Sequence, residues 1–408
     1  MKALILAGGS GKEMLPISKY SPKTFLSLHG KFLVEYVIDG LIEAGLEEFV
    51  VVVGYQGEKI NKILEKYHGK DIILDIVNQG SKKGIEGAIL AASGHFSKTE
   101  PFLLAYGDII APSKFYRHLM NSYINTAADG AIAVTLVGKS AEFGIASLDD
   151  RGFITKILPE TSINGDEANY IFAGASILPG EFFNVLQDEK KLTSALGRLL
   201  NEQRRICASV WLDEWIDVGY GWDLLEANKV IFKNIEYSRI HKSAKISPSS
   251  YISGLVFIEK NVTIDHNAEI VGPCFIGENS YIGTNSLIRS FSCIEKNCTI
   301  GFSVEVKNSI VQPNVKIGRL SFIGDSVIGE GAKIGAGVTT INYIKGLSPD
   351  LYPTIIKGRE YEKLGAIIGP RVDVGSNTVI FPSIKIDHDE IIPPSSVIKS
   401  DIMEKKED

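Results

Sequence analysis

Cysteine is scarce in this chain, with four residues in 408. They are Cys207, Cys274, Cys293 and Cys298, and no two of them stand at the C-x-x-C spacing of a metal site. Four cysteines in a chain of this length give no disulfide framework. We therefore expect buried, reduced thiols and a cytoplasmic protein.

Strong net charge and long apolar runs are absent as well. The formal net charge is −6, which excludes the basic footprint of a nucleic-acid-binding protein. No apolar run reaches the length of a membrane span, and the first apolar run is too short for a signal peptide. We expect neither nucleic acid nor membrane among the partners. The composition, 44% hydrophobic and 23% charged, is that of an ordinary globular protein.

The N-terminus holds the stretch around which the chain is organised, Leu4-Ile5-Leu6-Ala7-Gly8-Gly9-Ser10-Gly11. Residues 3–7 predict a buried parallel strand, and three glycines follow it within four residues. Residues 32–41 then predict a helix. Strand, glycine loop and helix form the arrangement in which backbone N–H groups close on phosphate oxygens. Alone, such a loop is equally compatible with a plain strand exit.

From residue 1 to about 235, short apolar strands alternate with amphipathic helices. Strands are predicted over residues 48–53, 72–77, 102–106 and 131–137, and helices over 58–67 and from 87 onward. The alternation predicts a doubly wound α/β domain, whose ligands bind at the carboxyl ends of the strands.

Two aspartates stand at positions suited to a metal. Asp108 directly follows an apolar strand, and Asp217 lies in Trp215-Ile216-Asp217-Val218-Gly219. A carboxylate at a strand end is well placed to hold Mg²⁺ against phosphate oxygens. The alternative for each aspartate is a turn or helix-cap role.

Together these landmarks resemble those of sugar-1-phosphate nucleotidyltransferases. The resemblance rests on Leu6-Ala7-Gly8-Gly9, Pro22-Lys23, Tyr106-Gly107-Asp108 and residues 215–219. It implies transfer of a nucleotidyl group from an NTP, UTP or dTTP, to a sugar-1-phosphate with release of pyrophosphate. It assigns Mg²⁺ binding to Asp108 and Asp217, catalytic phosphate contacts to Lys23 and Lys12, nucleotide binding to Leu6, Ala7, Gly8, Gly9, Ser10, Gly11 and Gly84, and sugar binding to Gly144 and Gly174.

Several positions depart from the family pattern. Gly11-Lys12-Glu13 stands where the family has Gly-Thr-Arg. A carboxylate about 4 Å from a polyphosphate costs on the order of 4 kcal/mol at an effective dielectric of about 20. Ile85 replaces a base-reading threonine, and Phe172 replaces a sugar-contacting asparagine. These losses support an alternative: a non-catalytic regulatory or scaffolding homologue that binds a nucleotide, a sugar phosphate or a partner subunit.

A six-residue repeat dominates the second half of the chain. Isoleucine recurs at positions 246, 252, 258, 264, 270, 276, 282, 288, 294 and 300, followed by Val306. After two one-residue slips and an irregular insertion at about 343–363, the repeat returns from Ile368 to Ile398. Six residues per side and three sides per coil predict a left-handed parallel β-helix with an isoleucine core. The expected domains are therefore residues 1–235 and 236–400, with a solvated tail at 401–408.

The pairing of both halves resembles archaeal bifunctional enzymes whose β-helix carries an acetyltransferase, and also glucose-1-phosphate thymidylyltransferase-like proteins. The resemblance implies a homotrimer formed through the β-helix. Asn342 matches that family, but Arg319 stands where it has its histidine base and Phe322 where it has a tyrosine. Because arginine stays protonated near neutral pH, we do not expect acetyl transfer. His266 and His388 fall in repeat corners, where a solvated position is expected.

Overall fold

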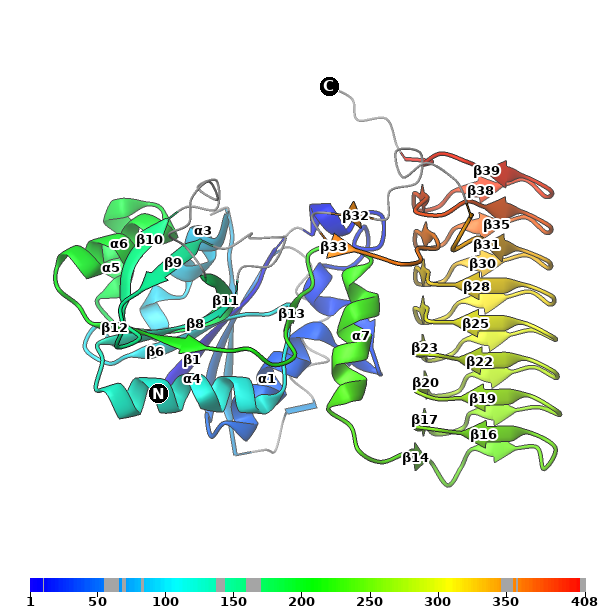
Figure 1. Cartoon of the computed structure of the whole chain (residues 1–408), viewed down its shortest axis with the longest axis horizontal. Helices are drawn as coiled ribbons and strands as arrows, with labels where there is room; N and C mark the ends of the chain where they lie inside the picture. The colour runs from blue at the N-terminus through cyan, green and yellow to red at the C-terminus, as the bar shows by residue number, and fades with distance from the viewer. Residues whose placement is uncertain are drawn as a thin grey trace. The chain divides into compact units, whose positions relative to one another are not determined.

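The computed structural model describes residues 1–9, 11–54, 66–67, 71–81, 84–136, 144–158, 170–345, 355–356 and 359–403. The chain forms two compact units (Figure 1). The α/β unit comprises Met1–Ser10, Pro22–Phe25 and Leu33–Asp217, and the β-helix unit comprises Gly11–Ser21, Leu26–Phe32 and Val218–Asp408. The N-terminal loop therefore contributes to both units. The expected boundary near residue 235 concerns independently folding domains and stays a prediction.

A nine-stranded mixed sheet forms the centre of the α/β unit. Its main strand order is β10-β9-β11-β6-β1-β4-β5, and β8 joins β11 to β12. These strands are β1 (Lys2–Ala7), β4 (Glu48–Val53), β5 (Ile73–Asn78), β6 (Phe102–Tyr106), β8 (Gly130–Leu136), β9 (Ile145–Leu148), β10 (Ile154–Leu158), β11 (Tyr170–Leu178) and β12 (Ile206–Val210). β1 is parallel to β4 and β6, whereas β11 is antiparallel to β6 and β8. The five predicted strands are confirmed to within one residue.

The helices of the α/β unit follow the predicted alternation. They are α1 (Leu33–Glu43), α3 (Gly84–Ala91), α4 (Ser113–Thr126), α5 (Phe182–Glu189) and α6 (Leu192–Asn201). α3 begins three residues before its predicted start, because Gly84 adopts a left-handed φ of 79° and turns the chain directly into the helix. The helix predicted over residues 58–67 lies mostly outside the described residues. Within the described part of the chain, no helix is long and apolar enough to cross a membrane.

Three parallel eight-stranded sheets build the β-helix, as the repeat predicts. Sheet I contains β14 (Arg239–Ile240), β17 (Val256–Ile258), β20 (Cys274–Ile276), β23 (Ser292–Ile294), β26 (Ile310–Val311), β29 (Val327–Ile328), β34 (Ile367–Ile368) and β37 (Lys385–Ile386). Sheet II contains β15 (Lys245–Ile246), β18 (Thr263–Ile264), β21 (Tyr281–Ile282), β24 (Thr299–Ile300), β27 (Lys316–Ile317), β30 (Lys333–Ile334), β35 (Asp373–Val374) and β38 (Ile391–Ile392). Sheet III contains β16 (Tyr251–Ser253), β19 (Glu269–Val271), β22 (Leu287–Arg289), β25 (Glu305–Lys307), β28 (Phe322–Gly324), β31 (Thr339–Thr340), β36 (Val379–Ile380) and β39 (Val397–Ile398).

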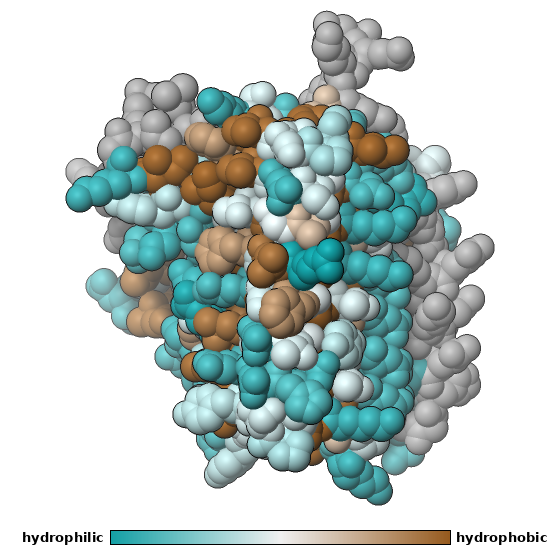
Figure 2. Space-filling view, turned by 90° about the vertical axis from the view of Figure 1, so that its right-hand side faces the viewer, coloured by the Kyte–Doolittle hydropathy of each residue, from teal (hydrophilic) through white to brown (hydrophobic). Residues whose placement is uncertain are grey.

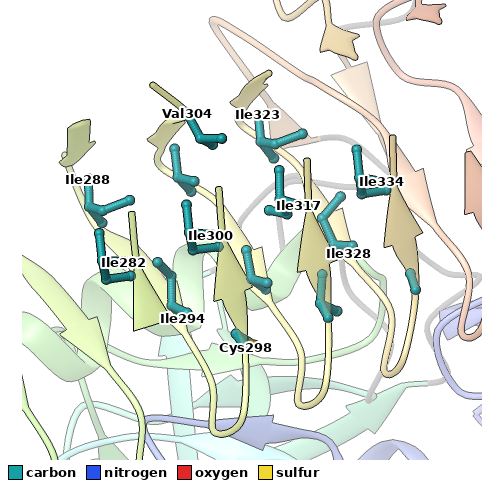
Figure 3. Packing of buried hydrophobic residues seen from close by; sticks show 14 of the residues in the cluster. Ile282, Ile288, Ile294, Cys298, Ile300, Val304, Ile317, Ile323, Ile328 and Ile334 are labelled. Carbon is teal, nitrogen blue, oxygen red and sulfur yellow. The ribbon is translucent and has the colours of Figure 1, made fainter. Parts of the chain in front are cut away.

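The isoleucines of the repeat fill the interior of the coil (Figure 3). Along sheet II, Ile282 lies in register with Ile300, and Ile300 with Ile317, so the same side chain stacks from coil to coil. All three are buried. The corners need a left-handed backbone, which asparagine tolerates. Four corner asparagines bond successively through their amides at 3.1–3.2 Å: Asn261, Asn279, Asn297 and Asn314.

Sheet I differs from the other two sheets on its outer face. Six of its eight outward side chains are apolar, and Phe275, Ile310 and Ile367 among them are buried. Within the β-helix unit, α7 (Asp223–Lys233) begins against this face, since a Cβ added at Gly221 would lie 2.5 Å from Ile367 Cδ1. Sheet II instead turns mostly polar residues outward, such as the exposed Lys316 and Lys333. The side of the molecule shown in Figure 2 carries hydrophilic residues on both sides of a band of apolar ones.

The insertion at 343–363 interrupts the repeat. Its described part holds β32 (Ile355–Ile356) and β33 (Arg359–Glu360), an antiparallel pair that joins none of the three β-helix sheets.

The prediction of buried cysteines without disulfide bonds is confirmed for all four thiols. Burial raises the pKa of Cys274 and of Cys298 to about 12, so neither is a ready nucleophile.

The hairpin of β2 (Ser27–Leu28) and β3 (Lys31–Phe32) packs within the β-helix unit through His29. The His29 ring stacks on Phe275 at 4.9 Å and meets the edge of Phe232 at 4.4 Å. His29 Nε2 lies 2.6 Å from Asn228 Oδ1. Burial, with a smaller effect of Lys31, lowers the pKa of His29 from 6.5 to about 4. The folded protein therefore keeps this ring neutral.

We expect His29 to make stability fall as pH is lowered from 6.5 to 4. Between these pH values the unfolded chain binds a proton at His29 that the folded chain does not. Because the site is partly buried, we expect this difference to lower the free energy of unfolding by about 2 kcal/mol. Urea unfolding of the native protein and of His29→Gln at several pH values measures the difference. The exposed His266 supplies the control variant, His266→Gln. Parallel pH profiles for the native protein and His29→Gln would contradict the expectation.

Candidate active site

Three parallel strands of the α/β unit end side by side, and each is followed by glycine. In β1, β4 and β6, Ala7 pairs with Val53 and Leu6 pairs with Tyr106. The loops beyond them touch: a Cβ added at Gly54 would lie 2.7 Å from Gly8 O, and one at Gly107 would lie 2.8 Å from Leu6 O. These contacts admit only glycine without a backbone shift. Beside Gly9, by contrast, a Cβ would meet no heavy atom of the described residues within 4 Å. Gly9 therefore offers open backbone at the strand edge.

Asp108 and Lys23 meet at this edge. Lys23 lies in the short helix η2 (Lys23–Phe25), and its Nζ is 2.5 Å from Asp108 Oδ2. The neighbouring Thr24 hydroxyl donates to Ala7 O at 3.1 Å, which ties η2 to the end of β1. Asp108 is 8% exposed, and its Oδ1 is buried with no hydrogen-bond partner among the described residues. A buried carboxylate oxygen without a donor is suited to a cation.

Asp217 lies beside Asp108. β13 (Ile216–Asp217) pairs antiparallel with β7 (Ile109–Ile110), and Asp217 is the partner of Ile109. Trp215 fixes this strand, because its Nε1–H donates to Ala173 O at 2.8 Å. One short strand pair thus brings Asp217 opposite Ile109, the residue that follows Asp108. The sequence indicated both residues but not the strand pair that joins them.

The carboxylates act together on a buried tyrosine. Burial, followed by the charges of Asp108, Asp217 and Glu86, raises the pKa of Tyr106 above its ordinary value. Both aspartate carboxylates therefore lie close enough to Tyr106 to disfavour its ionised form. Within the described residues, no three His, Cys, Asp or Glu side chains cluster as a complete metal site. Two carboxylates fit Mg²⁺ when phosphate oxygens and water complete its shell, as is usual for this ion.

Gln79 is a site residue that the sequence reading missed. Its Nε2–H donates to Gly84 O at 2.9 Å, and its Oε1 lies 2.5 Å from the position of a Cβ on Gly8. The side chain thus connects the loop after β1 with the predicted nucleotide-binding Gly84. Ile85, which follows, is 38% exposed. The available signal was position, since Gln79 directly follows β5 at the same edge of the sheet.

The two predicted sugar-binding glycines have different neighbours. A Cβ on Gly174 would lie 2.7 Å from Ile109 Cγ1, so Gly174 adjoins the Asp108 turn. A Cβ on Gly144 would lie 3.1 Å from Phe172 Cε2. The Phe172 ring is 6% exposed and packs in the hydrophobic core of the α/β unit. Phe172 therefore contributes packing at a position where the family has a polar group. The region that follows β10, residues 159–169, lies outside the described residues.

The second part of the glycine loop belongs to the β-helix unit. Gly11 has a left-handed φ of 59° and precedes the short helix η1 (Lys12–Met14). The Ser18 hydroxyl donates to Gly11 O at 2.6 Å. Lys12 and Glu13 are exposed. Ser10 lies outside the described residues, and the nucleotide-binding roles of the whole loop stay predictions.

In the β-helix, the positions compared with an acetyltransferase lack a base. Arg319 is exposed at a corner, and Asn342 Nδ2 donates to Asp325 Oδ2 at 2.5 Å. The solvated position predicted for His266 is confirmed by its 72% exposed side chain. The same prediction is wrong for His388, whose side chain is 9% exposed. Its ring packs edge-on against Tyr20 and lies 2.7 Å from Asp387, so an N-terminal residue covers this corner.

Comparison with known families agrees with this geometry. Residues 2–234 match the family described as nucleotidyl transferase, and residues 270–351 match the one described as GMPPB C-terminal domain. The chain belongs to the nucleotidyl transferase family. The resemblance seen in the sequence, a nucleotidyltransferase followed by a β-helix, is thereby confirmed.

Two relatives match this family member over nearly their whole length. The bifunctional sugar-1-phosphate nucleotidylyltransferase/acetyltransferase of Sulfurisphaera tokodaii is 31% identical over 98% of both chains. The bifunctional protein GlmU of Methanococcus maripaludis is 32% identical over 98% of this chain and 95% of its own. Among solved structures, apo UDP-glucose pyrophosphorylase has a TM-score of 0.50 and 22% identity, covering 57% of this chain and 99% of its own. That likeness concerns the fold alone.

Proposed function

We propose that the protein transfers a nucleotidyl group from an NTP, UTP or dTTP, to a sugar-1-phosphate and releases pyrophosphate. The observation that carries the proposal is the meeting of Lys23, Asp108 and Asp217 at the edge where β1 opens into Gly8 and Gly9. Membership of the nucleotidyl transferase family and the printed activities of the relatives support it. We further propose a cytoplasmic protein that forms a homotrimer through the β-helix.

In this proposal each site residue has a task in an in-line displacement at the α-phosphorus. Asp108 and Asp217 hold Mg²⁺, which neutralises charge on the phosphate oxygens when it is bound. Lys23 exchanges part of its ion pair with Asp108 for a phosphate oxygen and steadies the developing charge. The N–H groups at Gly8 and Gly9 bind phosphate oxygens, which approach through the open space beside Gly9. Gln79 holds the Gly84 turn, which the resemblance assigns to nucleotide binding.

A panel assay tests the proposal directly. Four NTPs are combined with a set of sugar-1-phosphates, and pyrophosphate release is measured with Mg²⁺ and with EDTA. We expect release that requires both a sugar-1-phosphate and Mg²⁺, with UTP or dTTP as the donor. If the folded protein releases no pyrophosphate with any combination, the regulatory or scaffolding alternative is favoured. Glu13 and the core position of Phe172 support that alternative.

Glu13→Arg is expected to tighten triphosphate binding about tenfold, because a carboxylate is replaced by a cation at the position where the family has arginine. Calorimetric titration with Mg²⁺-UTP or Mg²⁺-dTTP measures the effect. Glu100→Arg makes the same change of net charge at an exposed residue just before β6, at the opposite end of that strand from Asp108. Weaker binding by Glu13→Arg would mean that Glu13 takes an active part in the site.

A further inference from the structure

The loop that carries Lys23 crosses between the two compact units. Gly11–Ser21 and Leu26–Phe32 belong to the β-helix unit, whereas Pro22–Phe25 between them belongs to the α/β unit. Lys23 therefore sits in a four-residue stretch with β-helix-bound chain on both sides. Each flanking segment has its own polar attachment to the β-helix.

The attachment after Lys23 centres on a buried carboxylate. Glu295 is fully buried and follows β23 of sheet I. Its Oε2 accepts from the Ser27 hydroxyl at 2.6 Å, and both of its oxygens lie 3.2 Å from the Gly30 N–H. Gln312, one coil further on, brackets Ser27: its Nε2–H donates to Ser27 O at 2.8 Å, and its Oε1 accepts from Ser27 N at 3.3 Å. Two buried side chains of the β-helix thus hold one hairpin.

The attachment before Lys23 lies further along the β-helix, in its last coils, whereas Glu295 and Gln312 belong to middle coils. The Tyr20 hydroxyl donates to Asp389, and the guanidinium of Arg371 covers the Tyr20 ring at 3.8 Å. Arg371 also forms a bidentate ion pair with Asp389, with Nε 2.7 Å from Oδ1 and Nη2 2.8 Å from Oδ2. His388 closes the group against the ring edge of Tyr20. This attachment is half-exposed, in contrast to the buried pair that holds Ser27.

One corner of the β-helix supplies the buried attachment. The residue directly after each sheet I strand is glycine in three coils, at Gly277, Gly329 and Gly369. Glu295 and Gln312 occupy the same place in the coils that the hairpin contacts. Glu259 also occupies it, but pairs instead with the exposed Arg239. Of the two glutamates at this corner, the buried Glu295 holds the N-terminal hairpin, whereas the partly exposed Glu259 pairs with Arg239.

We propose that Glu295 and Gln312, with Tyr20 and its partners on the other side, are positioning residues for Lys23. The inference rests on the proposed nucleotidyl transfer, in which Lys23 contacts phosphate. Lysine has a long flexible side chain, so its ammonium is held in place only if its backbone is held. A misplacement of about 1 Å in a reacting group costs about 100-fold in rate. The proposed role of these β-helix residues is thus to hold the chain on both sides of Lys23.

A double-mutant cycle tests whether Glu295 acts through Lys23. Glu295→Ala is expected to lower kcat about 30-fold in the native background, with little change in KM for the sugar-1-phosphate, and less than about twofold in the Lys23→Met background. Glu295→Gln keeps an acceptor for Gly30 and is expected to restore most of the rate. Glu259→Ala, at the equivalent corner, is expected to leave kcat unchanged. An equal loss in both Lys23 backgrounds would overturn the proposal, since a merely structural effect is additive.

Hydrogen exchange supplies a readout that does not need turnover. The Phe25 N–H donates to Pro22 O at 2.9 Å within the Lys23 stretch. We expect its exchange to accelerate about tenfold in Glu295→Ala and, if that variant does not fold, about threefold in Tyr20→Phe, with no change in Glu259→Ala. Unchanged exchange in Glu295→Ala or its substitute would overturn the anchoring. If the native protein releases no pyrophosphate, the proposed function fails, while accelerated exchange still supports the anchoring of Lys23.

Discussion

Asp108→Asn is expected to lower kcat/KM for nucleotidyl transfer at least about 1,000-fold, because it removes a metal-binding charge and the ionic partner of Lys23 in one step. The substitution keeps the size of a side chain that is only 8% exposed, so packing is preserved. The buried Oδ1 lacks a hydrogen-bond donor among the described residues, and we propose that it binds the metal. Pyrophosphate release under saturating Mg²⁺ measures the loss.

Asp75→Asn is the matched control for this variant. Asp75 lies on β5 of the same sheet, its side chain is 46% exposed, and its neighbour is His95 at 3.6 Å. We expect Asp75→Asn to keep native activity. Binding of Mn²⁺ in the presence of nucleotide, followed by calorimetry, separates metal binding from turnover. Native Mn²⁺ affinity in Asp108→Asn would remove Asp108 from the metal site.

The residues at strand ends were predictable because one physical rule places them. Parallel strands end at one edge, so Gly8 and Asp108 were expected at the same edge of the sheet, and the pairing of β1 with β6 makes them neighbours. The position of Asp217 was harder to predict from the sequence. It depends on the pairing of β7 with β13, and two-residue strands are too short to show an alternation of apolar and polar residues. Gln79 carries no motif of its own in the sequence reading and becomes visible only through its contacts with Gly84 and Gly8.

The sequence contained an indication that the N-terminal loop attaches to the β-helix, but the regular isoleucine repeat drew attention away from it. The period-six isoleucines report only the interior of a coil. The residue before each of them lies on the outer face, and in six of the eight strands of sheet I this residue is apolar: Phe257, Phe275, Cys293, Ile310, Val327 and Ile367. Six apolar residues on one outer face predict a cover. Which chain segment supplies the cover depends on long-range contacts such as that of His29 with Phe275, and local pattern does not specify those.

Ile300→Asp is expected to lower the free energy of unfolding by more than about 4 kcal/mol, because it places an unpaired charge and a void inside the coil. Ile300 is fully buried and stacks between Ile282 and Ile317 of the neighbouring coils (Figure 3). Its neighbour Thr299 faces outward on the same two-residue strand. Thr299→Asp is therefore expected to change the same free energy by less than about 0.5 kcal/mol.

Ile300→Asp and Thr299→Asp together test which face of β24 points into the coil. Both introduce the same charge into β24, one position apart, so that any difference between them reflects only the face on which the side chain lies. Urea unfolding followed by far-UV circular dichroism measures each variant. Equal destabilisation by Ile300→Asp and Thr299→Asp would mean that the strand does not keep one face inside. Because β-helix coils stabilise mainly their neighbours, we expect the Ile300→Asp loss to spread along the stack toward Ile282 and Ile317.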